Sequence, residues 1–131
     1  MTAPEIRGEK VEIYGYKAWI VKKAYLTVDE KGLHVRPTVY VVVIHPEDPK
    51  GCYIYEIRDG DEWTYDWLSS LSVAELYREV KDNVDALYTM VREKIAVFNV
   101  LKELLEKEGV VVSATCWGYY KSIEDAVKIT Q

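Results

Sequence analysis

Two histidines and two cysteines are the residues of this chain best suited to bind a transition metal: His34, His45, Cys52 and Cys116. Zinc is bound by neutral imidazole and thiolate groups at short fixed distances, and these usually come from pairs that are close in the sequence. No two of these residues have that spacing, so a zinc site would require the fold to gather four separated side chains. Histidines at turns and strand ends are the simpler interpretation, and we expect no bound cofactor.

The same two cysteines raise the question of a disulfide. Cys52 and Cys116 both fall in segments that we predict to be strands, so a bridge between neighbouring strands would be geometrically reasonable. Disulfides are rare inside most cells, with hyperthermophiles as an exception. Two buried thiols are the favoured interpretation, because free cysteine is among the most buried residue types.

A pair of carboxylates on a predicted hairpin suggests a different metal-dependent chemistry. Asp48, Glu56 and Arg58 resemble the acid–acid–lysine pattern of restriction-endonuclease-like nucleases, which hold a divalent ion with carboxylates on adjacent strands. The resemblance covers only this hairpin, and Arg58 stands where the family has lysine, although a guanidinium does not readily lose a proton. The resemblance implies a metal-dependent nuclease, whereas ordinary surface carboxylates are the simpler interpretation.

Aromatic residues of the predicted strands form a third candidate site, made of Trp19, Tyr25, Tyr40, Tyr53 and Tyr55. If these side chains share one face of the sheet, they could stack on unpaired bases, with nearby lysine and arginine contacting the phosphates. The same set could instead form a core or a dimer interface, where aromatic residues are enriched. The formal net charge of −5 favours the second interpretation.

The elements that position these residues follow from the apolar pattern. Alternation predicts strands with turns between them, and the continuous β-branched run from Thr38 to Ile44 is typical of a central strand buried on both faces. Asp29 to Gly32 is a hairpin turn, and Gly118 to Tyr120 a second turn. A capping box beginning at Ser122 predicts a short helix through Ile129. The predicted strands are Val11–Tyr14, Tyr16–Val28, Leu33–Val35, Thr38–Ile44, Cys52–Arg58 and Val110–Trp117.

The longest predicted element runs from Ser72 to Gly109. Ser72 is the expected N-cap, and Gly109 the expected C-cap. Apolar residues recur between them at helical spacing without a proline, so the segment is one helix or two nearly coaxial ones with a kink near Asn83. At about 1.5 Å per residue such a helix is about 50 Å long, which is more than the width of a domain of this size.

The C-terminal half of this helix is apolar on more than one side. Val91, Ile95, Phe98, Leu101 and Leu105 continue the main stripe, which we expect to cover the sheet. A wide apolar surface needs two partners, and we expect the second to be another copy of the chain, contacted through Met90, Val97, Val100 and Leu104. The alternative is that the short C-terminal helix covers this second side.

Size and composition predict a single domain over residues 1–131. The apolar fraction of 49% argues against disorder, and no apolar run is long enough to span a bilayer. We expect a two-layer α+β domain with an antiparallel sheet of about four to five strands, one long helix on a face and a short C-terminal helix. The N-terminus lacks the regions of a signal peptide, so we expect a cytoplasmic protein.

Polar residues are strongly biased against amides, since Gln occurs only at Gln131 and Asn only at Asn83 and Asn99. This bias is typical of proteins from very hot habitats. In composition the chain resembles small uncharacterised proteins of hyperthermophilic archaea and their viruses, which implies an origin but no activity. We therefore predict a non-enzymatic, homodimeric interaction protein, with single-stranded nucleic-acid binding as the alternative and a metal-dependent enzyme as the third hypothesis.

Overall fold

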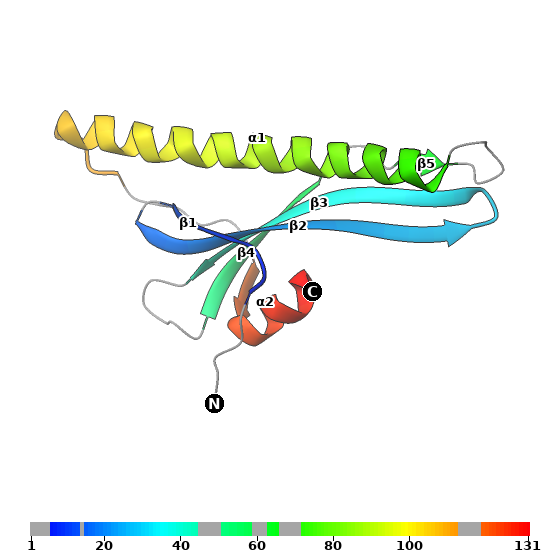
Figure 1. Ribbon diagram of the computed structural model, residues 1–131. Helices are drawn as coiled ribbons and strands as arrows, with labels where there is room; N and C mark the ends of the chain where they lie inside the picture. The colour runs from blue at the N-terminus through cyan, green and yellow to red at the C-terminus, as the bar shows by residue number, and fades with distance from the viewer. Residues whose placement is uncertain (1–5, 14, 45–50, 59–62, 66–71, 113–118) are drawn as a thin grey trace.

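The structure is a computed structural model that describes residues 6–13, 15–44, 51–58, 63–65, 72–112 and 119–131. The described residues have the predicted α+β class, and a single sheet carries a helix on each face (Figure 1). In chain order its elements are β1 (Glu9–Ile13), β2 (Tyr16–Asp29), β3 (Gly32–Ile44), β4 (Gly51–Arg58), β5 (Trp63–Tyr65), α1 (Val73–Lys107), β6 (Tyr119–Ser122) and α2 (Ile123–Thr130).

The sheet is antiparallel at every described pairing, in the order β1-β2-β3-β4-β6. β5 and β4 pair with the same edge of β3. β5 pairs with Leu33–Val35, and β4 pairs with Thr38–Ile44. Pro37 lies between the segments of β3 that pair with β5 and with β4, which is a position where a missing backbone donor is tolerated. The prediction of a central Thr38–Ile44 segment is therefore confirmed.

The predicted turn from Asp29 to Gly32 closes the long hairpin of β2 and β3. Gly32 has a φ of 135°, and the Asp29 carboxylate accepts a hydrogen bond of 2.8 Å from the backbone N–H of Lys31. The two predicted strands Leu33–Val35 and Thr38–Ile44 are one continuous strand in the structure. Proline does not interrupt β3, because pairing with β2 continues through Ala24 and Pro37.

The two faces of the sheet carry different helices, so the prediction of two layers is wrong. On one face, Leu87, Val91 and Ile95 of α1 pack on a cluster that includes Ile20 and Val41. On the other face, Ala126 of α2 packs on Val21, Tyr40, Val42 and Ile54, with Cys52 in the same cluster. β3 is buried from both sides because its alternate residues supply both cores, which produces three layers.

α1 is one uninterrupted helix of 35 residues, so the break considered near Asn83 does not occur. Its predicted caps are confirmed: the Ser72 hydroxyl accepts the Glu75 N–H at 3.2 Å. At the other end, the N–H groups of Gly109 and Val110 donate to the carbonyls of Glu106 and Leu105 at 3.0 Å, and Gly109 has a φ of 81°. This pair of bonds is a Schellman motif, which satisfies the last helical carbonyls.

The last predicted strand, Val110–Trp117, is described only at its start. Val110–Val112 belong to no strand, residues 113–118 lie outside the described residues, and a strand is found at Tyr119–Ser122, where the sequence predicts a turn. β6 pairs with the start of β4 and leads directly into α2, whose N-cap is Ser122. Tyr119 and Tyr120 thus lie in a strand that pairs with β4, and the predicted turn is wrong at these two residues.

Candidate interaction surface

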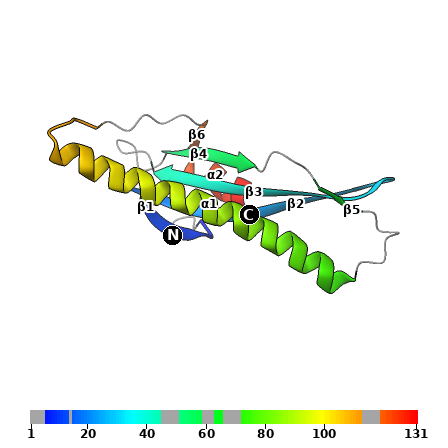
Figure 2. The ribbon, with the colours of Figure 1, turned by 90° about the horizontal axis from the view of Figure 1, so that it is seen from above.

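The middle of α1 is the part of the helix that holds it on the sheet. Its buried residues are Val84, Leu87, Val91 and Ile95, spaced three or four apart so that they lie on one side of the helix. Figure 2 shows α1 crossing the strands obliquely, so that the helix lies over the sheet at its middle and diverges from the strands toward its ends. The crossing explains why burial is confined to these central turns.

The C-terminal third of α1 projects past the strands and remains apolar (Figure 1). Three of the four predicted interface residues lie there, with 62% of Val97, 55% of Val100 and 55% of Leu104 exposed, while the fourth, Met90, is 40% exposed. The single chain therefore leaves all four accessible. We call Met90, Val97, Phe98, Val100, Leu101 and Leu104 the apolar surface of α1.

The expectation that Phe98 and Leu101 cover the sheet is wrong. They are 46% and 48% exposed although they continue the stripe that begins with Val91 and Ile95. At this point α1 reaches the end of the sheet, where Asn99 still bonds to Glu12 of β1, so the stripe is only partly covered by its own chain. The predicted excess of helix length over domain width is the signal that could have identified these two residues.

The C-terminal helix does not cover the apolar surface of α1, so the alternative considered for that role is wrong. Ile123, Ala126, Val127 and Ile129 of α2 pack on the opposite face of the sheet. The sheet itself separates the two helices. Within the described residues, the second apolar side of α1 is therefore exposed in the single chain.

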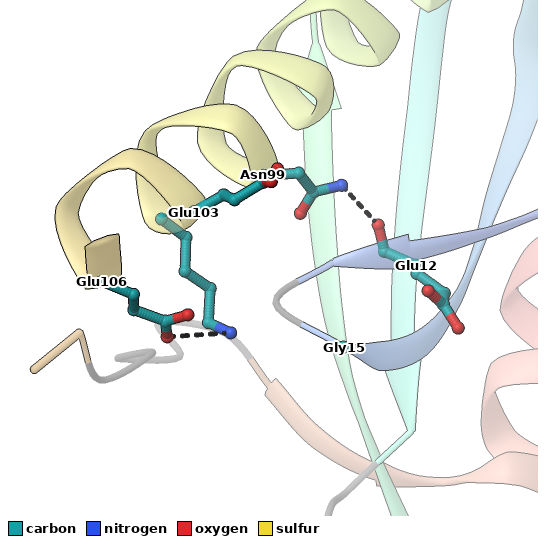
Figure 3. A pocket seen from close by; sticks show the side chains of 6 residues that line it. Glu12, Gly15, Asn99, Glu103 and Glu106 are labelled. Carbon is teal, nitrogen blue, oxygen red and sulfur yellow. Dashed lines mark hydrogen bonds and ion pairs between the residues drawn. The ribbon is translucent and has the colours of Figure 1, made fainter.

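A pocket lined mainly by polar residues lies between the C-terminal third of α1 and the connection from β1 to β2 (Figure 3). The Asn99 amide donates a hydrogen bond of 2.8 Å to the backbone carbonyl of Glu12, and Lys102 and Glu106 form an ion pair of 3.2 Å. Glu103 and Gly15 also line this pocket of about 330 Å³. Asn99, Lys102 and Glu106 thus make part of the side of α1 that faces its own domain polar.

Charges along this part of α1 balance but are not evenly distributed. Arg92, Glu93 and Lys94 give its first turn a net charge of +1, whereas Lys102, Glu103, Glu106, Lys107 and Glu108 give its last turns −1. Some of these charges pair within the chain, as Arg92 does with Glu9 at 3.1 Å and Lys107 with Glu103 at 3.5 Å. All are surface pairs, so their contribution to stability is small.

The five aromatic residues proposed for base stacking do not share a face, so that expectation is wrong. Trp19, Tyr25 and Tyr40 lie on the face covered by α2, whereas Tyr53 and Tyr55 lie on the face covered by α1. The pairing of β3 with β4 decides this, because Tyr55 is opposite Val41 and Glu56 is opposite Tyr40. These five rings therefore form no continuous platform for a single strand of nucleic acid.

The four-residue zinc site is also wrong. Cys52 pairs with Ile44, ten residues after His34 in the same strand, which separates the two by about 30 Å at about 3.3 Å per residue. His34 instead contacts Asp29, with 2.8 Å between Nε2 and Oδ1, and the Cys52 thiol donates to the Ser122 carbonyl at 3.6 Å. His45 and Cys116 lie outside the described residues, so the two buried thiols and the alternative of a disulfide between Cys52 and Cys116 both stay predictions.

Of the two carboxylates predicted on the hairpin, the structure describes only Glu56. Glu56 forms an ion pair with Arg58 on the same side of β4, and Asp48 lies outside the described residues. Among the residues that the structure describes, no three His, Cys, Asp or Glu side chains come close enough to hold a metal ion. The resemblance to nucleases thus gains no geometric support from this part of the chain.

Comparison with known proteins supplies no family for this chain, since no family model, curated protein or solved structure matches it. Charged residues recur along α1, and in the described part of the chain no helix is both long and apolar enough to cross a membrane.

Proposed function

We propose that the protein is a non-enzymatic interaction protein that forms a homodimer through the apolar surface of α1, and that it comes from a hyperthermophilic archaeon or its virus. The observation that carries the proposal is the exposure of Val97, Val100 and Leu104 on a capped, continuous helix that projects past its own sheet. Contiguous apolar surface of this kind marks interaction sites in folded proteins.

The spacing of the exposed residues favours another helix as the partner. Met90, Val97 and Leu104 are seven residues apart, and Val100 and Leu101 lie three and four residues after Val97. This is the apolar repeat through which two helices pack side by side. The described part of the chain contains no second helix that could meet it, because α2 packs on the far face of the sheet.

Charge distribution favours a second copy in antiparallel orientation. Such a pair brings the Arg92–Lys94 turn of one helix, with its net charge of +1, toward the Lys102–Glu108 turns of the other, with −1. A twofold axis makes the same contact twice, as expected for an isologous dimer. A parallel pair would instead place like charges beside each other.

Light scattering coupled to gel filtration tests the proposal with two matched substitutions on one helix. Val100→Asp buries a charge in the proposed interface and is expected to give a monomer, since an unpaired buried charge is costly. Val73→Asp is the control, because Val73 is 85% exposed and lies in the first turn of α1, where an acidic residue is favoured. Wild type and the control are expected to be dimers.

A wild-type protein that is monomeric at tens of micromolar contradicts the proposal, as does a Val100→Asp variant that remains a dimer. Circular dichroism of the variant distinguishes dissociation from loss of the fold. A monomeric and folded Val100→Asp variant beside a dimeric Val73→Asp variant is the supporting result.

A further inference from the structure

The long strand β2 has one open edge. β1 pairs with β2 only as far as Ile20, whereas β3 pairs with the other side of β2 from Ala18 to Asp29. Among the strands that the structure describes, none pairs with residues 21–28 on the side of β1. Figure 1 shows this part of β2 in the long hairpin arm, away from α2. An unpaired edge of this length is a template for another strand.

Backbone groups at alternate positions of this edge point away from β3. Asp29 and Gly32 are directly opposite and flank a two-residue turn, which makes them a hydrogen-bonded pair. Every second residue back along β2 therefore bonds to β3, and the residues between them direct their N–H and C=O groups outward. The pairing of Tyr16 with Ile13 gives the same phase from the side of β1. The residues with outward groups in the arm are Lys22, Ala24, Leu26 and Val28.

Two of these residues also have apolar side chains that the single chain leaves exposed. Leu26 is 63% exposed and Val28 is 56% exposed, although alternation places both on the face of Ile20, which α1 covers in the core. α1 has diverged from the strands where they lie (Figure 2). An open backbone edge and exposed apolar side chains thus occur together in one strand.

The sequence of the arm is complementary to itself when it is reversed about Leu26. Antiparallel pairing of two copies about this residue sets Leu26 opposite Leu26 of the second copy, and Ala24 opposite Val28. The hydrogen-bond phase agrees, because each of these three residues directs its backbone groups outward and can exchange both hydrogen bonds with its opposite residue. The apolar side chains then meet on one face of the joined sheet.

Charges at the two ends of the arm select the same direction. Lys22 and Lys23 lie at one end, and Asp29 and Glu30 lie at the other. Antiparallel pairing about the centre of the arm sets Lys22 opposite Glu30 of the second copy, and Lys23 is likewise opposite Asp29. Unlike charges directly opposite stabilise a sheet, whereas parallel pairing in register would bring like charges together.

Three of these charged side chains already have partners in their own chain, namely Lys22 with Asp85, Lys23 with the Ile129 carbonyl and Asp29 with His34. The charges therefore decide the direction and register of pairing. The affinity comes from backbone hydrogen bonds and from the apolar side chains.

We propose that the open edge of β2 pairs with the same edge of a second copy, antiparallel about Leu26. This contact does not depend on the proposed α1 dimer, since it uses a different surface. Each backbone hydrogen bond contributes little net stability and the contact is small, so it should form at about millimolar concentration, above that needed for the α1 dimer. A chain with two separate twofold contacts joins α1 dimers end to end.

Sedimentation equilibrium of the Val100→Asp variant isolates this contact, because that variant lacks the proposed α1 interface. We expect a monomer at tens of micromolar and self-association at about millimolar concentration. Adding Leu26→Lys sets two lysines opposite each other at the twofold axis and should weaken association at least about tenfold. Val111→Lys is the matched control, since Val111 is 90% exposed and follows the end of α1 that Figure 1 shows farthest from the hairpin turn.

A charge exchange tests the register. In the Val100→Asp background, Glu30→Lys alone sets lysine opposite the Lys22 of the second copy, and Lys22→Glu alone sets glutamate opposite Glu30. Each variant should associate several-fold more weakly than its parent at low salt. An equimolar mixture of the two restores unlike charges at both ends of the arm and should recover the affinity of the parent. Because neither protein is altered on mixing, recovery does not depend on how each substitution affects folding.

Amide exchange measured by NMR tests the backbone pairing residue by residue. As concentration rises to about millimolar, exchange at Ala24, Leu26 and Val28 should slow, because their N–H groups become bonded to the second copy. Exchange at Tyr25 and Thr27 should not change, since these N–H groups already bond to β3. This pattern identifies the contact even where the α1 proposal fails and Val100→Asp is not a monomer at low concentration.

Three results would overturn the proposal: exchange at Ala24, Leu26 and Val28 that is independent of concentration, association of Leu26→Lys equal to that of Val111→Lys, or no recovery on mixing the two charge variants. Circular dichroism identifies any variant that fails to fold, and wild-type exchange then decides the result. Alternating protection along β2 together with recovery on mixing is the supporting outcome.

Discussion

The middle of α1 and its C-terminal third share one apolar spacing but have opposite surroundings. Val84, Leu87, Val91 and Ile95 are buried against the sheet, whereas Val97, Val100, Leu101 and Leu104 are about half exposed on the same uninterrupted helix. An apolar repeat thus specifies the helix and the side that will be covered, but it does not specify what covers it. The sheet covers the apolar side in the middle of α1. In our proposal, a second copy of the chain covers it in the C-terminal third.

The largest expected effect comes from truncating one leucine in each region. Leu87→Ala leaves a cavity in the core and should lower the free energy of unfolding by about 2–5 kcal/mol. Leu104→Ala removes little packing within the single chain, so its effect should appear mainly where dimers form. Urea unfolding at two protein concentrations measures both.

The loss for Leu87→Ala should be the same at both protein concentrations, whereas that for Leu104→Ala should grow with concentration. A loss of several kcal/mol for Leu104→Ala at the lower concentration would mean that the two regions do not differ as described.

Substitution of Gly109, at the C-terminal end of α1, compares the stability of the last turns of the helix with that of its central turns. Gly109 has a φ of 81°, and a β-carbon at this position would have open space around it, so Gly109→Ala adds backbone strain without a clash. The expected cost is about 1 kcal/mol, felt as faster amide exchange in the last turns of α1 and not in the central turns. Gly109→Asn should cost less, because Asn adopts the left-handed conformation more readily.

Equal acceleration of exchange along the whole of α1 in Gly109→Ala would show that the projecting segment is not independent of the covered one.

Charge reversal tests the proposed orientation of the two helices. Lys94→Glu should weaken the dimer several-fold at low salt, because exposed pairs contribute about 0.2–1 kcal/mol each. Combining it with Glu103→Lys restores opposite charges across an antiparallel interface and should recover affinity, as sedimentation equilibrium would show. Failure to recover, or a stronger dimer with Lys94→Glu alone, would contradict the antiparallel arrangement.

The smallest effect is expected at the exposed end of the hairpin. The hydrogen bond with His34 is the main cause that holds the pKa of Asp29 below its ordinary value. Because the unfolded chain has the ordinary carboxyl pKa, the pair stabilises the fold above about pH 4. That contribution is lost as pH falls through the lowered pKa. Asp29→Asn should therefore unfold slightly more easily than wild type at pH 6 and equally at pH 2.

Thermal unfolding at the two pH values measures this difference, which is small because Asp29 is exposed. A larger difference in thermal stability between wild type and Asp29→Asn at pH 2 than at pH 6 would contradict the expected pH dependence.

Local signals in the sequence predict the fold class, both caps of α1, the hairpin turn and the central segment of β3. Each depends on neighbouring residues, such as Ser72 with Glu75. The face of the sheet that carries Tyr53 and Tyr55 is not predictable in this way, because it follows from the register between β3 and β4, and a shift of one residue reverses it.

The candidate site is predictable in part. Met90, Val97, Val100 and Leu104 are identified by their position off the main stripe, and the structure leaves them exposed. Phe98 and Leu101 are misassigned because helical spacing does not show where the supporting sheet ends. The open edge of β2 is not predictable from local pattern, since it depends on the point at which pairing with β1 ends.

Amide hydrogen exchange along α1 at low and high protein concentration tests the proposed dimer. We expect exchange between Val97 and Lys107 to slow as concentration rises, while exchange between Val84 and Ile95 does not change, because only the former segment is covered by a second copy. Exchange that is independent of concentration in both segments would contradict the proposed dimer.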